Sequence, residues 1–335
     1  MRRIFNTVVT VLLSLLSVWV TAVCLICIAV YVFTKKLSRK PSSVFVVNLL
    51  VTQLLQGLVV IPAYAIRMSN VFPEGYYYSL SCDVWRLGYM LVFYGTCINV
   101  MLVAIDRLIV VQFSFSKKIQ LSKRTCFVIC AASWFYILLL CLIPFIPTQR
   151  SFVLKDSQCT YNHQAEWSAF MLIGNCAVPF LIVFLCYVRI VYVSEKRFKN
   201  IQAQMPRRLS DQSTWVQDKL NKLTIQITLW YAITWLPSIV YYSIITIRPE
   251  TFSKEFYSSN LQTVIECVIK LIKFFDAVFA PLVYCYNSSD FKDAFNKLFR
   301  IKSKRDSVND TNSTTHNLGS IRKKLQVSLS GLEED

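Results

Sequence analysis

Glycine, histidine and charged residues are scarce in this chain of 335 residues. It holds 7 Gly and 2 His, and only 16% of its residues are charged, whereas 55% are hydrophobic. Soluble domains are usually about 45–50% apolar and about 25% charged. The composition therefore excludes an ordinary soluble protein and places the chain among integral membrane proteins.

Patterns that enzymes and nucleic-acid-binding proteins need are also missing. The two histidines, His163 and His316, stand in no HExxH pattern, and the sequence has neither a GxSxG motif nor a phosphate-binding glycine loop. We therefore expect no enzyme, cofactor or metal site. The net charge of +17 comes without a soluble basic domain, so we expect no nucleic-acid partner. Duplicated spans that would favour a transporter are absent as well.

What the sequence does have is a series of long apolar stretches, each able to cross a bilayer as a helix, which takes about 20 residues. They are apolar on all sides, which is typical of helices and not of barrel strands. They lie at 7–33, 43–66, 84–112, 125–146, 167–193, 217–246 and 261–286. We predict an all-α membrane protein, a seven-transmembrane helix bundle over residues 7–286.

Basic residues collect in the connections on one side of this bundle. Cytoplasmic loops are enriched in Lys and Arg. The connections after the first, third and fifth spans carry Lys35, Lys36, Arg39, Lys40, Lys117, Lys118, Lys123, Arg124, Lys196, Arg197, Lys199, Arg207 and Arg208. We expect that side to be cytoplasmic and to attract anionic membrane lipid. A short N-terminus, residues 1–6, would be extracellular in a multi-pass protein of the plasma membrane.

The segment after the last span splits into two parts. Residues 287–301 place Phe291, Phe295, Leu298 and Phe299 on one helical face and basic residues on the other, which predicts a short amphipathic helix on the membrane surface. Residues 302–335 are polar and rich in Ser, Thr and Asn, so we expect a disordered cytoplasmic tail.

Most of the 12 cysteines fall inside the spans, where Cys behaves as a small apolar residue. Cys82 opens the third span, and Cys159 lies in the connection between the fourth and fifth spans. Both would face the oxidising outer compartment, where a disulfide persists. We therefore predict a Cys82–Cys159 disulfide.

Charge and proline interrupt the spans at particular places. Asp106 and Arg107 stand near the cytoplasmic end of the third span, where charged residues are costly and mark function. Arg107 held by Asp106 in one state and released in another would be a switch; a static ion pair is the alternative. Pro179, Pro237 and Pro281 each remove a backbone hydrogen bond and permit a kink.

The order of these features resembles the rhodopsin-like (class A) G-protein-coupled receptors over residues 40–300. The matching positions are Cys82, Asp106, Arg107, Trp134, Cys159, Pro179, Tyr187, Trp235, Leu236, Pro237, Pro281, Tyr284 and Phe291. The spacings from Cys82 to Arg107 and from Tyr284 to Phe291 are those of the family.

The resemblance implies roles for these positions. Arg107 would meet a heterotrimeric G protein, with Tyr187 and Tyr284 swinging inward to support it. Trp235 would lie under the ligand pocket and relay its occupancy to the kinks at Pro237 and Pro281. An arrestin and a receptor kinase would act at the tail.

Two hallmark polar positions depart from the family. Gln53 replaces the usual acidic residue of the second span, and Ala280 replaces the Asn before Pro281. The cluster that holds sodium in many relatives is thus depleted. Sodium modulation should be weak or absent.

The resemblance also places candidate ligand-binding residues. By family position they are Tyr89, Phe93, Asn175, Ser238, Tyr242, Lys270, Lys273 and Phe274. Tyr89 stands where amine receptors carry an aspartate, which disfavours a monoamine ligand. Phe274 stands where opsins carry the retinal lysine; Lys273 is one residue away, so an opsin-like photoreceptor remains an alternative, as does a non-signalling decoy receptor.

The seventh span holds four ionisable residues, and each needs a partner in a membrane. Glu266 with Lys270, and Lys273 with Asp276, have the spacing of intrahelical pairs. If one lysine is instead available to a ligand, that extracellular ligand would be an acidic small molecule, a lipid or a short peptide, helped by Arg67 and Arg86. Both interpretations stay open at this point.

Overall fold

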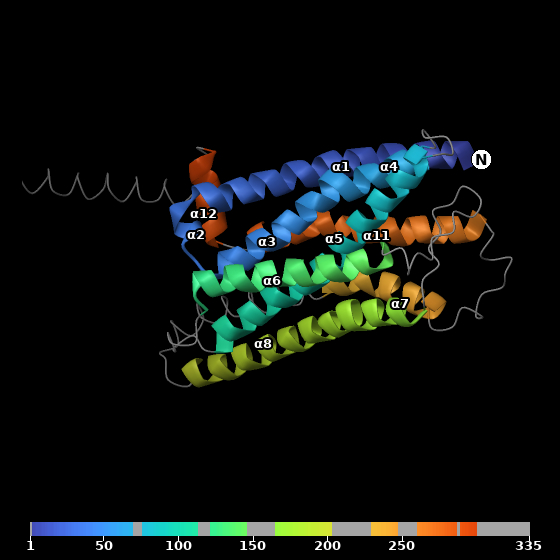
Figure 1. Cartoon of the computed structure of the whole chain (residues 1–335). Coiled ribbons are helices and arrows are strands. Elements are labelled where there is room, and N and C mark those ends of the chain that lie inside the picture. The colour runs from blue at the N-terminus through green and yellow to red at the C-terminus, as the bar shows by residue number, and fades with distance from the viewer. Residues whose placement is uncertain are drawn as a thin grey trace, which may run out of the picture.

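The computed structural model describes residues 2–69, 76–112, 121–145, 165–202, 229–246, 260–286 and 289–299. The regular elements in these ranges are helical and their long helices run side by side (Figure 1). They are α1 (Arg2–Phe33), α2 (Lys35–Ser38), α3 (Ser42–Leu55), η1 (Gln56–Val60), α4 (Ile61–Met68), α5 (Tyr76–Gln112), α6 (Lys123–Leu142), η3 (Ile143–Phe145), α7 (Ala165–Leu172), η5 (Ile173–Ala177), α8 (Val178–Gln202), the helix 229–246, α11 (Asn260–Tyr286) and α12 (Ser289–Leu298).

Five of the helical runs are long and apolar enough to cross a membrane by length and composition. They are Ile4–Phe33, Ser42–Met68, Cys82–Gln112, Lys123–Leu142 and Trp167–Lys196. They coincide with the first five predicted spans. The helix 229–246 and α11 lie at the predicted sixth and seventh spans, while residues 217–228 lie outside the described residues. The first helix begins at Arg2, five residues earlier than expected, because no helix breaker precedes the apolar run.

Two spans contain a widened π-helical turn that was not predicted from the sequence. The turn η1 ends two residues before Pro62, and η5 ends two residues before Pro179. A proline has no N–H and its ring crowds the carbonyl of the preceding turn, so an extra residue in that turn relieves the clash. Each widened turn changes which side chains beyond it face the bundle.

Gly57, within η1, lets this turn approach α1 closely. A Cβ on Gly57 would lie 2.8 Å from Thr21 Oγ1 and 3.0 Å from a methyl of Val20. Ser17 Oγ donates to the carbonyl of Gly57 at 2.8 Å. Small residues at helix contacts permit this kind of approach in membranes.

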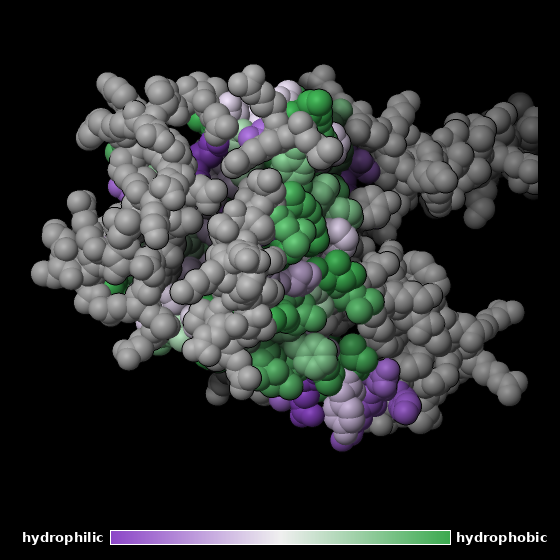
Figure 2. Space-filling model, turned by 90° about the vertical axis from the view of Figure 1, so that its right-hand side faces the viewer, coloured by the Kyte–Doolittle hydropathy of each residue, from purple (hydrophilic) through white to green (hydrophobic). Residues whose placement is uncertain are grey.

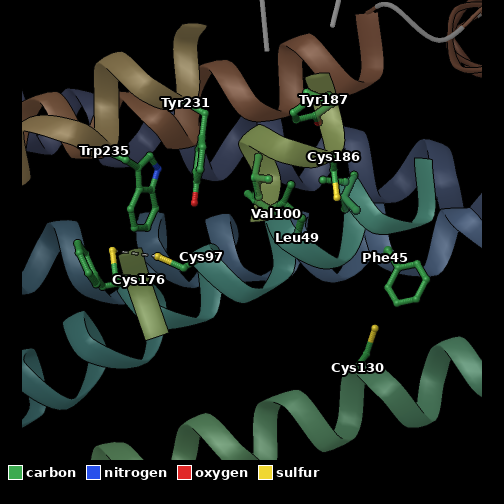
Figure 3. Close-up of a cluster of buried hydrophobic side chains, with 14 of the residues drawn as sticks. Phe45, Leu49, Cys97, Val100, Cys130, Cys176, Cys186, Tyr187, Tyr231 and Trp235 are labelled. Carbon is green, nitrogen blue, oxygen red and sulfur yellow. Dashed lines mark hydrogen bonds between the residues drawn. The ribbon is translucent and has the colours of Figure 1, made fainter. Parts of the chain in front are cut away.

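The helix α5 crosses the bundle obliquely and forms its centre (Figure 1). It shares a buried cluster with α3, α6, η5, α8 and the helix 229–246. Figure 3 shows Trp235 and Tyr231 reaching toward α5, where Cys97 donates a 3.5 Å hydrogen bond to Cys176. Inside a bilayer, packing contacts and not escape from water hold such helices together.

A polar network ties three helices in the interior. Trp134 of α6 donates to Asn48 Oδ1 of α3 at 2.8 Å, and Asn48 donates to Asn99 Oδ1 of α5 at 2.7 Å. Asn99 in turn donates to Thr52 Oγ1 at 2.6 Å. Satisfied polar groups at these depths fix the relative register of the helices.

The helix α12 lies across the end of the bundle beside α2 (Figure 1). Phe291 and Ala294 are buried, and the Phe291 ring packs on Tyr31 of α1 at 5.5 Å. Leu298 and Phe299 are exposed, which leaves an apolar surface where a membrane-surface helix would contact lipid.

Candidate functional site

A column of aromatic rings runs along one face of α5. Trp85, Tyr89 and Phe93 are four residues apart, and their ring centroids lie 5.3 and 5.7 Å apart in stacked pairs. Tyr64 of α4 stacks on Trp85 at 5.6 Å, and Phe93 contacts Trp235 of the helix 229–246 at 5.0 Å. The column therefore connects the end of the bundle that carries the start of α5 with the buried Trp235.

Charged residues surround Trp85 and Tyr64, the rings of the column nearest the start of α5, which we call its upper layer. Lys270 Nζ is 3.1 Å from Glu266 Oε2 and lies 5.2 and 5.4 Å from the ring centroids of Tyr64 and Trp85. The Arg67 guanidinium lies 4.5 Å above Trp85. Cations over aromatic faces are attracted by the ring quadrupole. This upper layer thus combines two cations, one carboxylate and two aromatic faces.

A second lysine lies one helical turn further along α11, deep in the bundle. Lys273 is 2% exposed, and its Nζ lies 3.6 Å from Asp276 Oδ2 and 3.2 Å from the ring centroid of Trp235. Asp276 accepts a 3.3 Å hydrogen bond from Gln53 Nε2 of α3. Both ion pairs that the spacing in α11 predicted are therefore formed.

The remaining pocket candidates separate into two groups. Ser238 is buried, and within the described part of the chain its Oγ has no hydrogen-bond partner; the same holds for Nε1 of Trp85 and Trp235. Tyr242 is half-buried against Tyr241, with an edge-on ring contact at 5.3 Å. Trp85 and Trp235 belong to the aromatic column, and Tyr242 packs against the buried cluster that holds Phe93 and Trp235.

Among the described contacts none brings Asn175, another predicted pocket residue, to this column. It lies in the widened turn η5, where its Oδ1 accepts a 2.9 Å hydrogen bond from Tyr136 of α6 and its amide donates to Met171. Phe274 does contact the aromatic column, but from a different side of α11 than Lys273, because one step along a helix rotates the side chain by about 100°. Its ring meets Tyr64 edge-on at 5.9 Å.

The opposite end of the bundle, beside α2 and α12, holds the predicted switch pair. Asp106 is buried and accepts a 3.1 Å hydrogen bond from Ser42 Oγ, while Arg107 is exposed. The predicted Asp106–Arg107 contact is not formed among the described ion pairs, because neighbouring residues on a helix do not face each other. The carboxylate instead attaches α5 to the start of α3.

The other predicted switch residues lie at separate places in the described part of the bundle. Tyr187 is buried in the central cluster (Figure 3), and Pro281 is buried inside an uninterrupted α11. Pro237 is half-buried two residues after Trp235. The side chain of Tyr284 lies outside the described set.

Cys82 is disulfide-bonded, and nine other cysteines of the described residues are free thiols. Its predicted partner, Cys159, lies outside the described residues, so that pairing stays a prediction. Among the described side chains no group of three His, Cys, Asp or Glu could hold a metal ion.

Sequence reasoning missed Tyr64 and Trp85 as site residues. The spacing of 85, 89 and 93 was the available signal, since aromatic residues four apart share one helical face. The contact of Lys273 with Trp235 carries no sequence signal, because it joins two helices whose relative rotation the pattern leaves open.

Comparison with known proteins gives a consistent family assignment. The family described as "7 transmembrane receptor (rhodopsin family)" matches residues 23–284. Octopamine receptor beta-2R of Chilo suppressalis is 21% identical over 77% of this chain and 71% of its own length. The D(5)-like dopamine receptor of Takifugu rubripes is 24% identical, and the D(1) dopamine receptor of Carassius auratus 23% identical, over 53% of this chain. The chain spans 39% and 52% of those two dopamine receptors.

The match covers most of the chain and includes the segments before the helix 229–246 and between that helix and α11, and it ends inside α11. It confirms the predicted helical seven-transmembrane bundle in a multi-pass membrane protein, and a receptor in place of an enzyme. The protein belongs to the rhodopsin family of seven-transmembrane receptors, whose members signal through G proteins.

Proposed function

We propose that this receptor detects an acidic small molecule at the extracellular end of its bundle and activates a heterotrimeric G protein at the cytoplasmic end. The observation that carries the ligand class is the upper layer of the aromatic column. There Arg67 and Lys270 meet the faces of Trp85 and Tyr64, with Glu266 as the neighbouring carboxylate.

The hydrogen-bonding capacity of this region favours a ligand rich in acceptors. Trp85 Nε1 and Trp235 Nε1 can only donate, and both are buried without a partner among the described residues. Unmet buried donors are costly, and a ligand carboxylate or carbonyl would relieve that cost. Ligands of this kind would also stack their apolar body on the rings of the column.

Glu266 is the residue that such a ligand would displace. Its side chain is 30% exposed, whereas that of Lys270 is 10% exposed. Glu266 also accepts a 3.1 Å hydrogen bond from Gln262, so it keeps a partner when Lys270 turns to the ligand. The exchange replaces one carboxylate by another and leaves no buried charge alone.

A monoamine ligand, as named for the octopamine and dopamine receptors, has less support in this chain. Tyr89 stands where amine receptors carry an aspartate. The two carboxylates near the column, Glu266 and Asp276, both face lysines at 3.1 and 3.6 Å. An ammonium ligand would have to separate one of these pairs and leave a lysine charge unmatched.

The route from ligand to G protein follows the column. A ligand on Trp85 presses through Tyr89 and Phe93 on Trp235, the ring at 5.0 Å from Phe93. Trp235 moves with the helix 229–246, and α5 carries, five residues before its end at Gln112, the exposed Arg107 that meets the G protein. In this account the receptor lies in the plasma membrane with its N-terminus outside, its basic side against anionic lipid, and its tail available to a receptor kinase and an arrestin.

Figure 2 shows the end of the bundle on which we place the ligand. The described side chains in the middle of this face are mostly apolar, and hydrophilic ones lie toward its margins. A ligand with an apolar body and one acidic group matches this distribution.

A ligand screen with paired variants tests the ligand class. Cells expressing the receptor and a promiscuous G-protein reporter are exposed to matched acids and amines. We expect acids to activate, Lys270→Ala to abolish the response at unchanged surface expression, and Lys270→Arg to retain a response because it keeps the charge. Activation by amines, with Lys270→Ala unaffected, would overturn the acidic ligand.

A second candidate is an opsin-like photoreceptor that binds an aldehyde through Lys273. In its favour, this buried amine has the carboxylate of Asp276 at 3.6 Å as a counter-ion. Against it, the indole of Trp235 lies 3.2 Å from Nζ and would have to move away first. Incubation with retinal decides: a visible absorbance band that Lys273→Ala removes supports it, and no band rejects it.

A further inference from the structure

Lys273 is held by two helices besides its own. Its Nζ lies 3.6 Å from Asp276, which is beyond hydrogen-bond length, and it has no hydrogen-bond partner among the described residues. The ammonium instead lies 3.2 Å from the ring centroid of Trp235 and 5.8 Å from that of Phe93. The aromatic face of Trp235 is therefore its nearest contact outside α11.

The carboxylate of Asp276 is bound to a different helix, α3. Asp276 is 3% exposed and accepts its hydrogen bond from Gln53 of α3, which is itself fully buried. A chain of contacts thus runs from α3 through α11 to the helix 229–246. Lys273 and Asp276 thus form an ion pair in which each charge also has a neighbour on a different helix.

A buried ammonium without hydrogen bonds depends strongly on its remaining contacts. Its desolvation must be offset by the carboxylate and by the ring, and a desolvated cation–π contact with Trp is the strongest of its kind. Any motion that takes Trp235 off Lys273 leaves the ammonium with Asp276 at 3.6 Å and the more distant Phe93 ring at 5.8 Å. The energy of that motion therefore includes the loss of the ring contact.

We infer that Lys273 acts as a latch that holds Trp235, and with it the helix 229–246, in the arrangement described here. The latch is a cation that the chain itself supplies between Asp276 and Trp235. It rests on the proposed signalling function only for its effect on G proteins; its effect on the helix 229–246 is independent of that function. Lys273 is thus a positioning residue that sets the ligand-independent activity.

Trp230 and Phe279 form a second contact between the helix 229–246 and α11, and this contact does not involve Lys273. These rings join the same two helices at 3.7 Å, but Phe279 is partly exposed on the outer side of the bundle. The helices would therefore stay adjacent when the latch opens. Opening should change the rotation or tilt of the helix 229–246 and not its position in the bundle.

The central test variant neutralises both charges at once, because removing one would leave the other buried and alone. Lys273→Met keeps the length of the side chain, and Asp276→Asn keeps an oxygen that can accept from Gln53. Phe275→Met is the matched control: it lies on the same turn of α11, but its ring is 45% exposed and points away from the latch.

Two readouts keep the latch and the signalling function apart. We expect the Lys273→Met/Asp276→Asn receptor, purified in detergent, to show several-fold faster amide hydrogen exchange in residues 229–246, with the Phe275→Met receptor unchanged. We also expect at least a threefold rise in ligand-independent nucleotide exchange. Faster amide exchange without any nucleotide exchange keeps the latch and rejects the G-protein function. Unchanged amide exchange in a folded variant overturns the latch.

A second variant serves if the double variant does not fold. Trp235→Phe keeps a ring but weakens the attraction for a cation, since Trp binds cations best. We expect a smaller rise in amide exchange and in basal activity than with Trp235→Leu. If the two substitutions instead have equal effects, the ring does not act through its attraction for the ammonium.

Discussion

The hydroxyl of Ser42 donates a 3.1 Å hydrogen bond to the buried carboxylate of Asp106 and so joins the start of α3 to the C-terminal part of α5. Arg107, the next residue, is exposed. The carboxylate that was expected to restrain this arginine is therefore engaged by a different helix. This hydrogen bond holds α5 against the start of α3.

Ser42→Ala should raise ligand-independent nucleotide exchange about two- to fivefold. The substitution removes a hydrogen bond to a charged group, which contributes about 1.5–3 kcal/mol when buried and less here because Ser42 is only part-buried. Ser43→Ala is the control, since Ser43 donates at 2.6 Å to the carbonyl of Lys40 in its own turn. Equal effects of the two variants would show that Ser42 acts through helix stability alone.

Gly57→Ala should destabilise the receptor by about 1–3 kcal/mol, the usual cost of overpacking. The added methyl would lie 2.8 Å from Thr21 Oγ1, so α1 and η1 would have to separate. The measurement is the thermal midpoint of the detergent-purified protein. Thr21→Ala in the same chain should restore part of the loss; a normal midpoint for Gly57→Ala alone would show that the two segments are not in close contact.

Trp134→Phe should lower the thermal midpoint, because Asn48 Oδ1 loses its 2.8 Å donor inside the bundle. An unsatisfied polar atom in the interior costs about 1–3 kcal/mol. Phe135→Leu provides the comparison, as this neighbour on α6 is 65% exposed on the outside of the bundle. If both variants melt at the wild-type temperature, the network does not hold α3, α5 and α6 together.

The helices and the family followed from the sequence because span length, charge asymmetry and motif order are properties of the chain itself. The two ion pairs of α11 were one of two interpretations that the sequence left open, since residues three and four apart on a helix are neighbours. The contacts that these residues make with other helices could not be predicted from the sequence. Asn175 is hydrogen-bonded to Tyr136, and Lys273 lies over the ring of Trp235. These contacts depend on the widened turns and on the rotation of each helix, which are set by packing between spans.

The central claim is that this chain carries a signal from its extracellular end to a G protein through Arg107. The direct measurement is GDP–GTP exchange on a panel of G-protein α subunits, with receptor reconstituted in lipid nanodiscs and activated by the best ligand of the screen. We predict that the wild-type receptor accelerates exchange on at least one subunit and that Arg107→Ala, equally folded and still binding ligand, does not. Acceleration that is equal in the two receptors, or absent from both, would contradict the account.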